Sequence, residues 1–246
     1  MTLLLSCLTP KYIVQVSDRR LTWPDGRLAD DQANKVVIFN NQAVFSYTGI
    51  SRIGAFRTDE WIAEQIIGRS GLQDAITHLT NALDTTVAKL PYPNRQLAVV
   101  IDCWAATQEV PQIQPWSCAI TNFFHPTARK VVAHALPTFS TFSQKLPDGK
   151  GYAFVPLGQD VAPVTMKRLI RSVVRAMRHA APTPTTIAPE SVGRFMRNAV
   201  LDEAATRRKS VWQIGMRLSP RPLDRGDFPR HKTRLLHVGN ICQCTF

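Results

Sequence analysis

The second residue of this chain, Thr2, could act as a nucleophile. A threonine hydroxyl attacks poorly unless a base takes its proton. Removal of Met1, which a small residue at position 2 allows, would leave the α-amine of Thr2 as that base. The reference pKa of such an amine is about 7.7–8.0, so the amine is partly neutral near pH 7. The N-terminus therefore indicates a nucleophile that carries its own base.

Three further residues stand at the ends of predicted strands in the first fifty positions. Asp18 follows the second predicted strand, 16 residues after Thr2. Lys35 opens the next strand 17 residues later, and Gly49 closes a hairpin another 14 residues on. Taken singly, these residues could be a turn cap, a solvated strand end and a turn glycine. Taken together, in this order and at strand ends, they favour one site.

This order and spacing resemble the N-terminal part of proteasome β-type subunits and their bacterial relatives, which belong to the N-terminal nucleophile (Ntn) hydrolase superfamily. The resemblance covers roughly residues 2–55. It implies a threonine-type hydrolase of amide bonds, a peptidase, with Thr2 as nucleophile. Lys35 would lie beside the hydroxyl and lower its pKa, and Asp18 would pair with Lys35. The amide of Gly49 would donate to the oxyanion.

The C-terminal half departs from this family. The family has a Gly-Ser-Gly turn before its third helix, and Gln159 takes the place of that serine here. After the fourth helix the family has an Asp-x-x-Ser pair, of which Ser210 matches the serine while Arg207 replaces the aspartate. Asp202 or Asp160 could orient the amine instead. The alternative is a catalytically inactive proteasome-like fold that serves as an assembly or binding module.

Hydrophobic periodicity predicts the elements that would position these residues. Strands are predicted at 3–8, 12–16, 36–39, 43–47, 96–104, 116–124, 130–136, 152–157 and 212–218, and helices at 52–67, 72–90, 161–181 and 189–208. Strands and helices come in blocks, which disfavours a parallel doubly wound sheet. We predict an α+β fold, a four-layer αββα sandwich of two antiparallel sheets flanked by helix pairs.

The chain is long enough for one sizeable core, since it has 246 residues of which 44% are hydrophobic. We predict one Ntn-hydrolase-like domain at residues 1–219. Residues 220–246 form a basic, proline-rich tail, with one further strand predicted at 234–238.

The formal net charge of +12 favours anionic partners in general. A solvated basic surface explains it better than nucleic-acid binding, because no nucleic-acid-binding motif is present. The predicted helix at 161–181 concentrates this charge on one face, which could line a ring entrance or meet an acidic partner. The expected partners are a peptide or amide substrate and, as in the related proteins, further copies in a ring-type homo-oligomer.

Five cysteines, an odd number, indicate free thiols and a reducing cytoplasm. Cys242 and Cys244 form the one closely spaced pair, and this spacing does not match that of zinc sites. We therefore expect no metal and no cofactor. We also expect Cys7, on the first strand, to be a core thiol. No stretch of 18 apolar residues predicts a membrane span.

Overall fold

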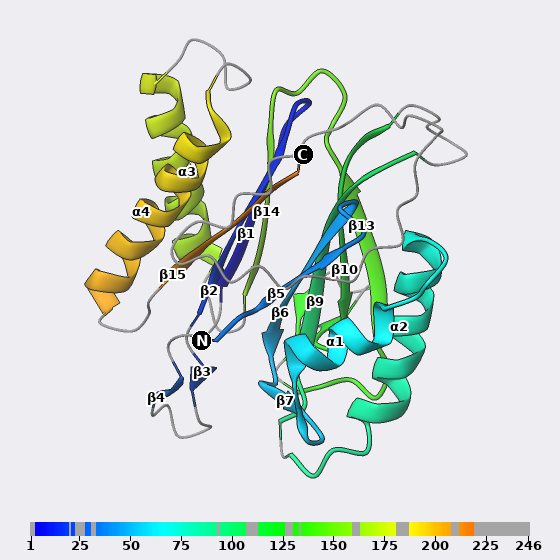
Figure 1. The fold of residues 1–246 in the computed structure, drawn as a ribbon. Coiled ribbons are helices and arrows are strands. Elements are labelled where there is room, and N and C mark those ends of the chain that lie inside the picture. The colour runs from blue at the N-terminus through cyan, green and yellow to red at the C-terminus, as the bar shows by residue number, and fades with distance from the viewer. Residues whose placement is uncertain are drawn as a thin grey trace.

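Two β-sheets lie face to face in the computed structural model of this chain, and helices cover their outer sides (Figure 1). The structure describes residues 3–19, 21–22, 28–30, 33–92, 94–106, 113–125, 130–132, 134–158, 163–180, 187–207 and 212–218. Thr2, Gln159, Asp160, Ser210 and the predicted tail at 220–246 lie outside these ranges.

The first sheet has four antiparallel strands in the order β14-β1-β2-β15. Their bounds are β1 Leu3–Leu8, β2 Ile13–Asp18, β14 Ala153–Gly158 and β15 Trp212–Leu218. A tight turn joins β1 to β2, in which the hydroxyl of Thr9 donates to the carbonyl of Tyr12 over 2.7 Å. The start of β1 consequently lies beside the end of β2, with Leu4 opposite Ser17.

The second sheet has five antiparallel strands in the order β13-β10-β9-β6-β5. Their bounds are β5 Val36–Phe39, β6 Ala43–Gly49, β9 Leu97–Ala105, β10 Gln114–Thr121 and β13 Ser140–Lys145. Asn40 and Asn41 turn β5 into β6, with φ angles of 46° and 56°. Asparagine tolerates such left-handed angles, which a two-residue hairpin turn requires.

Two pairs of helices complete four layers. Their bounds are α1 Thr58–Ile66, α2 Leu72–Val87, α3 Pro163–Ala180 and α4 Pro189–Arg207. The buried face of α1 and α2 packs on the second sheet, and α3 and α4 pack on the outer face of the first (Figure 1). The predicted α+β sandwich of two antiparallel sheets flanked by helix pairs is confirmed.

Three short hairpins stand apart from the two main sheets. They are β3 Leu21–Thr22 with β4 Leu28–Asp30, β7 Arg52–Ile53 with β8 Phe56–Arg57, and β11 Phe124–His125 with β12 Lys130–Val131. The prediction that a helix begins at Arg52 was therefore wrong. Ile53 and Phe56 have the spacing of one helix face, but they lie opposite each other across β7 and β8.

The sequence prediction also missed one strand and overextended another. The region 137–151 was expected to be a loop, yet it contains β13. This edge strand is polar except for Phe142, and its side chains are exposed or half-buried. The strand expected at 130–136 is only two residues long in the structure. An edge strand with little apolar surface lacks the alternation by which strands are recognised.

The basic face of α3 points away from the sheet. Leu169, Val173 and Met177 are buried against the first sheet. The cationic side chains of this helix are exposed, namely Lys167, Arg168, Arg171, Arg175 and Arg178. At about 100° per residue, the second set faces solvent when the first faces the core.

Among the described residues, no helix combines the length and the apolar character that crossing a bilayer requires.

Candidate active site

The strand ends that carry the predicted site residues lie at one end of the sandwich. Asp18 is the last residue of β2, Lys35 immediately precedes β5, and Gly49 is the last residue of β6. These ends and the start of β1 lie at the lower end of the two sheets in Figure 1. The described part of the structure does not include Thr2 or the side chain of Asp18, so their roles stay predictions.

Lys35 is fully buried, with 1% of its surface exposed. The interpretation of this lysine as a solvated strand end was therefore wrong. A buried ammonium needs polar partners, because an isolated charge in an apolar interior is very unfavourable. Such a lysine belongs to an internal polar site.

The side chain of Asn34 holds the backbone that follows Lys35. Its side-chain amide donates to the carbonyl of Val36 over 2.9 Å, and the amide of Val36 donates to its side-chain oxygen over 3.3 Å. Asparagine makes such contacts with the backbone two residues ahead. The path of the chain through Lys35 is thereby restrained locally.

Gly49 stands where only glycine fits. Its φ angle is +113°, a backbone conformation that residues with a side chain rarely adopt. A Cβ atom built there would lie 2.0 Å from the carbonyl oxygen of Gln96. The close approach of β6 to the start of β9 thus explains this glycine by itself, whether or not its amide also contacts an oxyanion.

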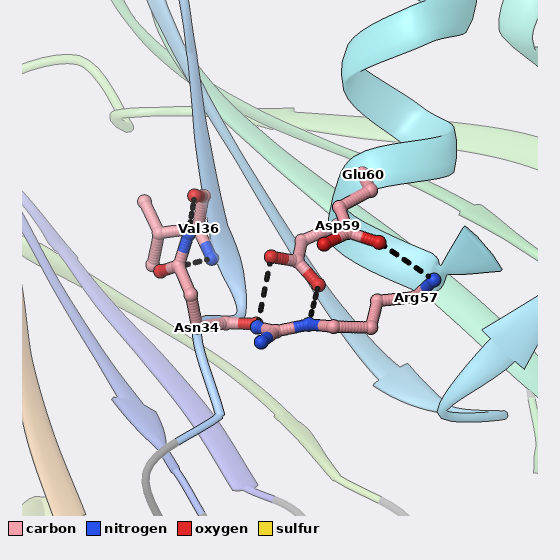
Figure 2. A network of polar contacts seen from close by, with 5 residues as sticks. All are labelled: Asn34, Val36, Arg57, Asp59 and Glu60. Carbon is pink, nitrogen blue, oxygen red and sulfur yellow. Dashed lines mark hydrogen bonds and ion pairs between the residues drawn. The ribbon is translucent and has the colours of Figure 1, made fainter. Parts of the chain in front are cut away.

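The start of α1 contacts both of these segments, and Figure 2 shows Arg57 on the side of Asn34. The guanidinium of Arg57 forks onto the carboxylate of Asp59 through two hydrogen bonds of 3.1 Å, and it also donates to the carbonyl of Asn34 over 3.4 Å. The hydroxyl of Thr58 donates to the carbonyl of Ile50 over 2.8 Å. These charged residues at a helix start were not singled out in the sequence, since they resemble a solvated first turn.

A carboxylate in the space between the sheets was also missed. Asp102 on β9 is completely buried, and its Oδ2 accepts hydrogen bonds of 2.5 Å from Ser6 on β1 and from Gln15 on β2. The hydroxyl of Ser46 on β6 donates to the side-chain oxygen of Gln15. This cluster links both sheets through side chains. An aspartate inside the apolar run Leu97–Ala105 was the signal that could have indicated it.

Desolvation by burial raises the pKa of Asp102 from 3.8 to about 6, against the lowering effect of the surrounding hydroxyls and amide. Its other oxygen, Oδ1, has no hydrogen-bond partner among the described residues. Ser117 lies directly opposite Asp102 on β10, and its hydroxyl is also buried without a bond of good geometry. The hydrogen bonds to an ionised Asp102 therefore do not fully compensate for the loss of its hydration.

The thiol of Cys7 is not a competing nucleophile. It is fully buried in the core between the first sheet and α3 and α4, and burial raises its pKa far above neutral pH. Since the thiolate is the reactive form, this thiol is inert in the folded chain. The expectation that Cys7 is a core residue is confirmed.

The groups expected around the amine of Thr2 are only partly described. Arg207 and Asp202 lie in α4, and nothing in the structure tests their roles. Within the described ranges, no group of three or more histidine, cysteine, aspartate or glutamate side chains is placed to hold a metal ion.

No protein-family model matches this chain, and no curated protein matches it. Among solved structures, the crystal structure of eukaryotic HslV from Trypanosoma brucei aligns with 89% of this chain and 99% of its own, at 14% sequence identity and a TM-score of 0.45. This similarity assigns no role to any residue of the chain.

Proposed function

We propose that this chain is an N-terminal threonine hydrolase that cleaves amide bonds of peptides once Met1 is removed. The observation that carries the proposal is the buried Lys35, which lies at the end of the sandwich where β1 begins and where β2 and β6 end. A lysine in such a place is suited to act on a neighbouring polar group. Thr2, Asp18 and Gly49 are the neighbours that the sequence pattern supplies.

In the first step, Thr2 Oγ attacks the carbonyl carbon of the scissile amide, and the hydroxyl proton passes to the α-amine of Thr2. The carbonyl π electrons move to oxygen, and the amide of Gly49 donates to this oxyanion. The charge of Lys35 lowers the pKa of the hydroxyl, and Asp18 pairs with Lys35. Ser210, with Asp202 or Asp160, would orient the amine.

In the second step, the C–N bond breaks, and the leaving amine takes the proton from the α-ammonium. An ester between Thr2 and the acyl group remains. Water then attacks this ester while the α-amine accepts its proton, and the threonine hydroxyl is restored as the acid leaves. Each proton removed by the amine is returned, so these steps balance without a metal or cofactor.

The test is intact mass spectrometry with a peptide epoxyketone, an electrophile directed at N-terminal threonine. We expect a mature chain without Met1 that gains one probe at Thr2. Thr2→Ala keeps a small residue, so Met1 is still removed, but labelling and amide turnover should fall at least about 10³-fold. Thr2→Ser, which retains a hydroxyl, is the matched control and should retain labelling. Unchanged turnover in Thr2→Ala contradicts the proposal.

The second candidate is the catalytically inactive fold that serves assembly or binding. Gln159 and Arg207, which replace a serine and an aspartate of the related family, are the features that favour it. A mature chain that retains Met1 and takes no probe would support this candidate, because a blocked amine cannot act as a base. The expected ring-type homo-oligomer is compatible with both candidates.

A further inference from the structure

Arg57, the N-cap residue of α1, and Thr58, its first residue, form hydrogen bonds with two chain segments that are distant from each other in sequence. Arg57 contacts the carbonyl of Asn34, 23 residues earlier. Thr58 contacts Ile50 through its hydroxyl and Ser51 through its amide. The first segment contains Lys35 and the second directly follows Gly49. The start of one helix thus forms hydrogen bonds with the sequence neighbours of two predicted site residues, Lys35 and Gly49.

On the Lys35 side, the contact completes a set of restraints on the backbone. The side chain of Asn34 already bonds both the amide and the carbonyl of Val36. Its own carbonyl accepts from Arg57. Figure 2 shows these bonds on the two sides of the segment. The peptide groups flanking Lys35 are therefore held from within the segment and from α1.

The guanidinium of Arg57 is itself held in place. Asp59 accepts its two parallel hydrogen bonds, and the carboxylate of Glu60 accepts from the backbone amide of Arg57 over 3.1 Å. The side chain of Asp59 is 7% exposed and that of Arg57 is 34% exposed. A half-buried pair of this kind contributes little to stability, but it fixes the orientation of the planar guanidinium group.

On the Gly49 side, both hydrogen-bond donors of Thr58, its hydroxyl and its backbone amide, form hydrogen bonds. Its hydroxyl bonds to the carbonyl of Ile50 over 2.8 Å, and its amide to the carbonyl of Ser51 over 3.1 Å. The amide of Ile50 in turn donates to the carbonyl of Gln96 over 3.2 Å. Thr58 is fully buried, so these bonds are shielded from water. The two bonds from Thr58 hold the peptide groups that follow Ile50 and Ser51, while the bond to Gln96 holds the peptide group between Gly49 and Ile50.

We propose that Arg57 and Thr58 are positioning residues of the active site, Arg57 for the ammonium of Lys35 and Thr58 for the amide of Gly49. This inference rests on the proposed hydrolase function. It assigns separate tasks to two neighbouring residues, because the ammonium of Lys35 is a cation and the amide of Gly49 is a neutral donor. These two groups affect the reaction differently. A purely structural role would make the two residues equivalent.

The test compares Arg57→Lys and Thr58→Val in the full chain. Lysine keeps the charge opposite Asp59, but a single ammonium cannot reproduce the fork and the carbonyl contact together. Valine keeps the shape of threonine without the hydroxyl. The control is Arg52→Lys. Arg52 lies opposite Arg57 across β7 and β8, is exposed, and bonds only locally to the carbonyl of Ala55.

The first readout is the maximal rate of labelling by the peptide epoxyketone, measured against pH. In Arg57→Lys we expect a fall of about tenfold to 100-fold. Its acid limb should move to higher pH, because a more distant Lys35 no longer lowers the pKa of the α-ammonium. In Thr58→Val we expect a fall of about tenfold without a shift of the limb, because the displaced donor is neutral. Probe affinity stays constant in all variants.

The second readout is hydrogen exchange, which does not depend on catalysis. Exchange should rise in the peptide spanning 33–39 for Arg57→Lys and in that spanning 45–53 for Thr58→Val, and in neither for Arg52→Lys. Identical pH profiles for the two variants, or unchanged exchange, would overturn the positioning roles. A wild-type chain that takes no probe would overturn the proposed function and any catalytic role of this pair. Raised exchange in the two variants would then show only that Arg57 and Thr58 hold the two backbone segments in place.

Discussion

Gly49→Ala is expected to lower the free energy of unfolding by roughly 3–5 kcal/mol, a large effect for the addition of one methyl group. The new Cβ would lie 2.0 Å from the carbonyl oxygen of Gln96 and 2.9 Å from the Cα of Leu97. Both are backbone atoms, which cannot rotate away. The φ angle of +113° adds backbone strain of its own. Urea denaturation followed by circular dichroism measures the change.

Gly54→Ala separates these two causes. Gly54 also has a positive φ, +62°, but a Cβ there would meet nothing within 4 Å. Only the conformational cost of about 1–2 kcal/mol should appear. Equal losses in the two variants would show that the approach of β6 to Gln96 is less close than described. Because Gly49→Ala disturbs the fold, it cannot test an oxyanion role for this residue, and Thr58→Val is the sharper probe of that role.

Asp102→Asn is expected to stabilise the chain near neutral pH by up to about 3 kcal/mol. The pKa of Asp102 is about 6 in the folded chain and near 3.8 when unfolded, and each unit of difference corresponds to 1.36 kcal/mol. Between pH 4 and 6 the folded chain binds more protons than the unfolded chain, so this residue makes stability fall as pH rises. The unfavourable contribution is complete above pH 6.

The measurement is the difference in unfolding free energy between Asp102→Asn and the wild type, taken from pH 4 to pH 7.5. The difference should grow between pH 4 and about pH 6 and then level off, since asparagine does not titrate. The amide of the asparagine can donate to Ser117 while its oxygen accepts from Ser6 and Gln15. A difference that is constant with pH would contradict the raised pKa. Asp102→Ala is the control, and it should destabilise the chain at every pH because it leaves those donors buried without an acceptor.

The apolar pattern was sufficient to predict the longer elements, because α2 buries one continuous face and the central strands are apolar runs buried on both faces. The α2 helix and strands β1, β2, β6 and β9 lie where the apolar positions indicated. The failures have a common cause. In β13 all side chains but that of Phe142 are polar, and β7 and β8 are too short to alternate. Local pattern carries no signal in such elements, since pairing with a neighbour determines their structure.

The candidate site was predicted less completely than the fold. Residue type and spacing predicted roles for Lys35 and Gly49, which the structure brings to one end of the sandwich; these roles stay predictions. They gave no sign of Arg57 or Thr58, because long-range hydrogen bonds between side chain and backbone leave no periodic trace. The burial of Lys35 was likewise invisible in the sequence, where a charged residue beside a strand suggests solvent.

The three thiols that are buried in the described part of the chain divide between the two halves of the sandwich. Cys7 lies in the first sheet, and Cys103 and Cys118 lie on adjacent strands of the second. Burial raises the pKa of Cys103 to about 12 and that of Cys118 to about 11. Alkylation at these positions consequently requires the surrounding structure to open. Peptide-resolved alkylation kinetics would show whether the two sheets separate together or whether one half unfolds while the other stays intact.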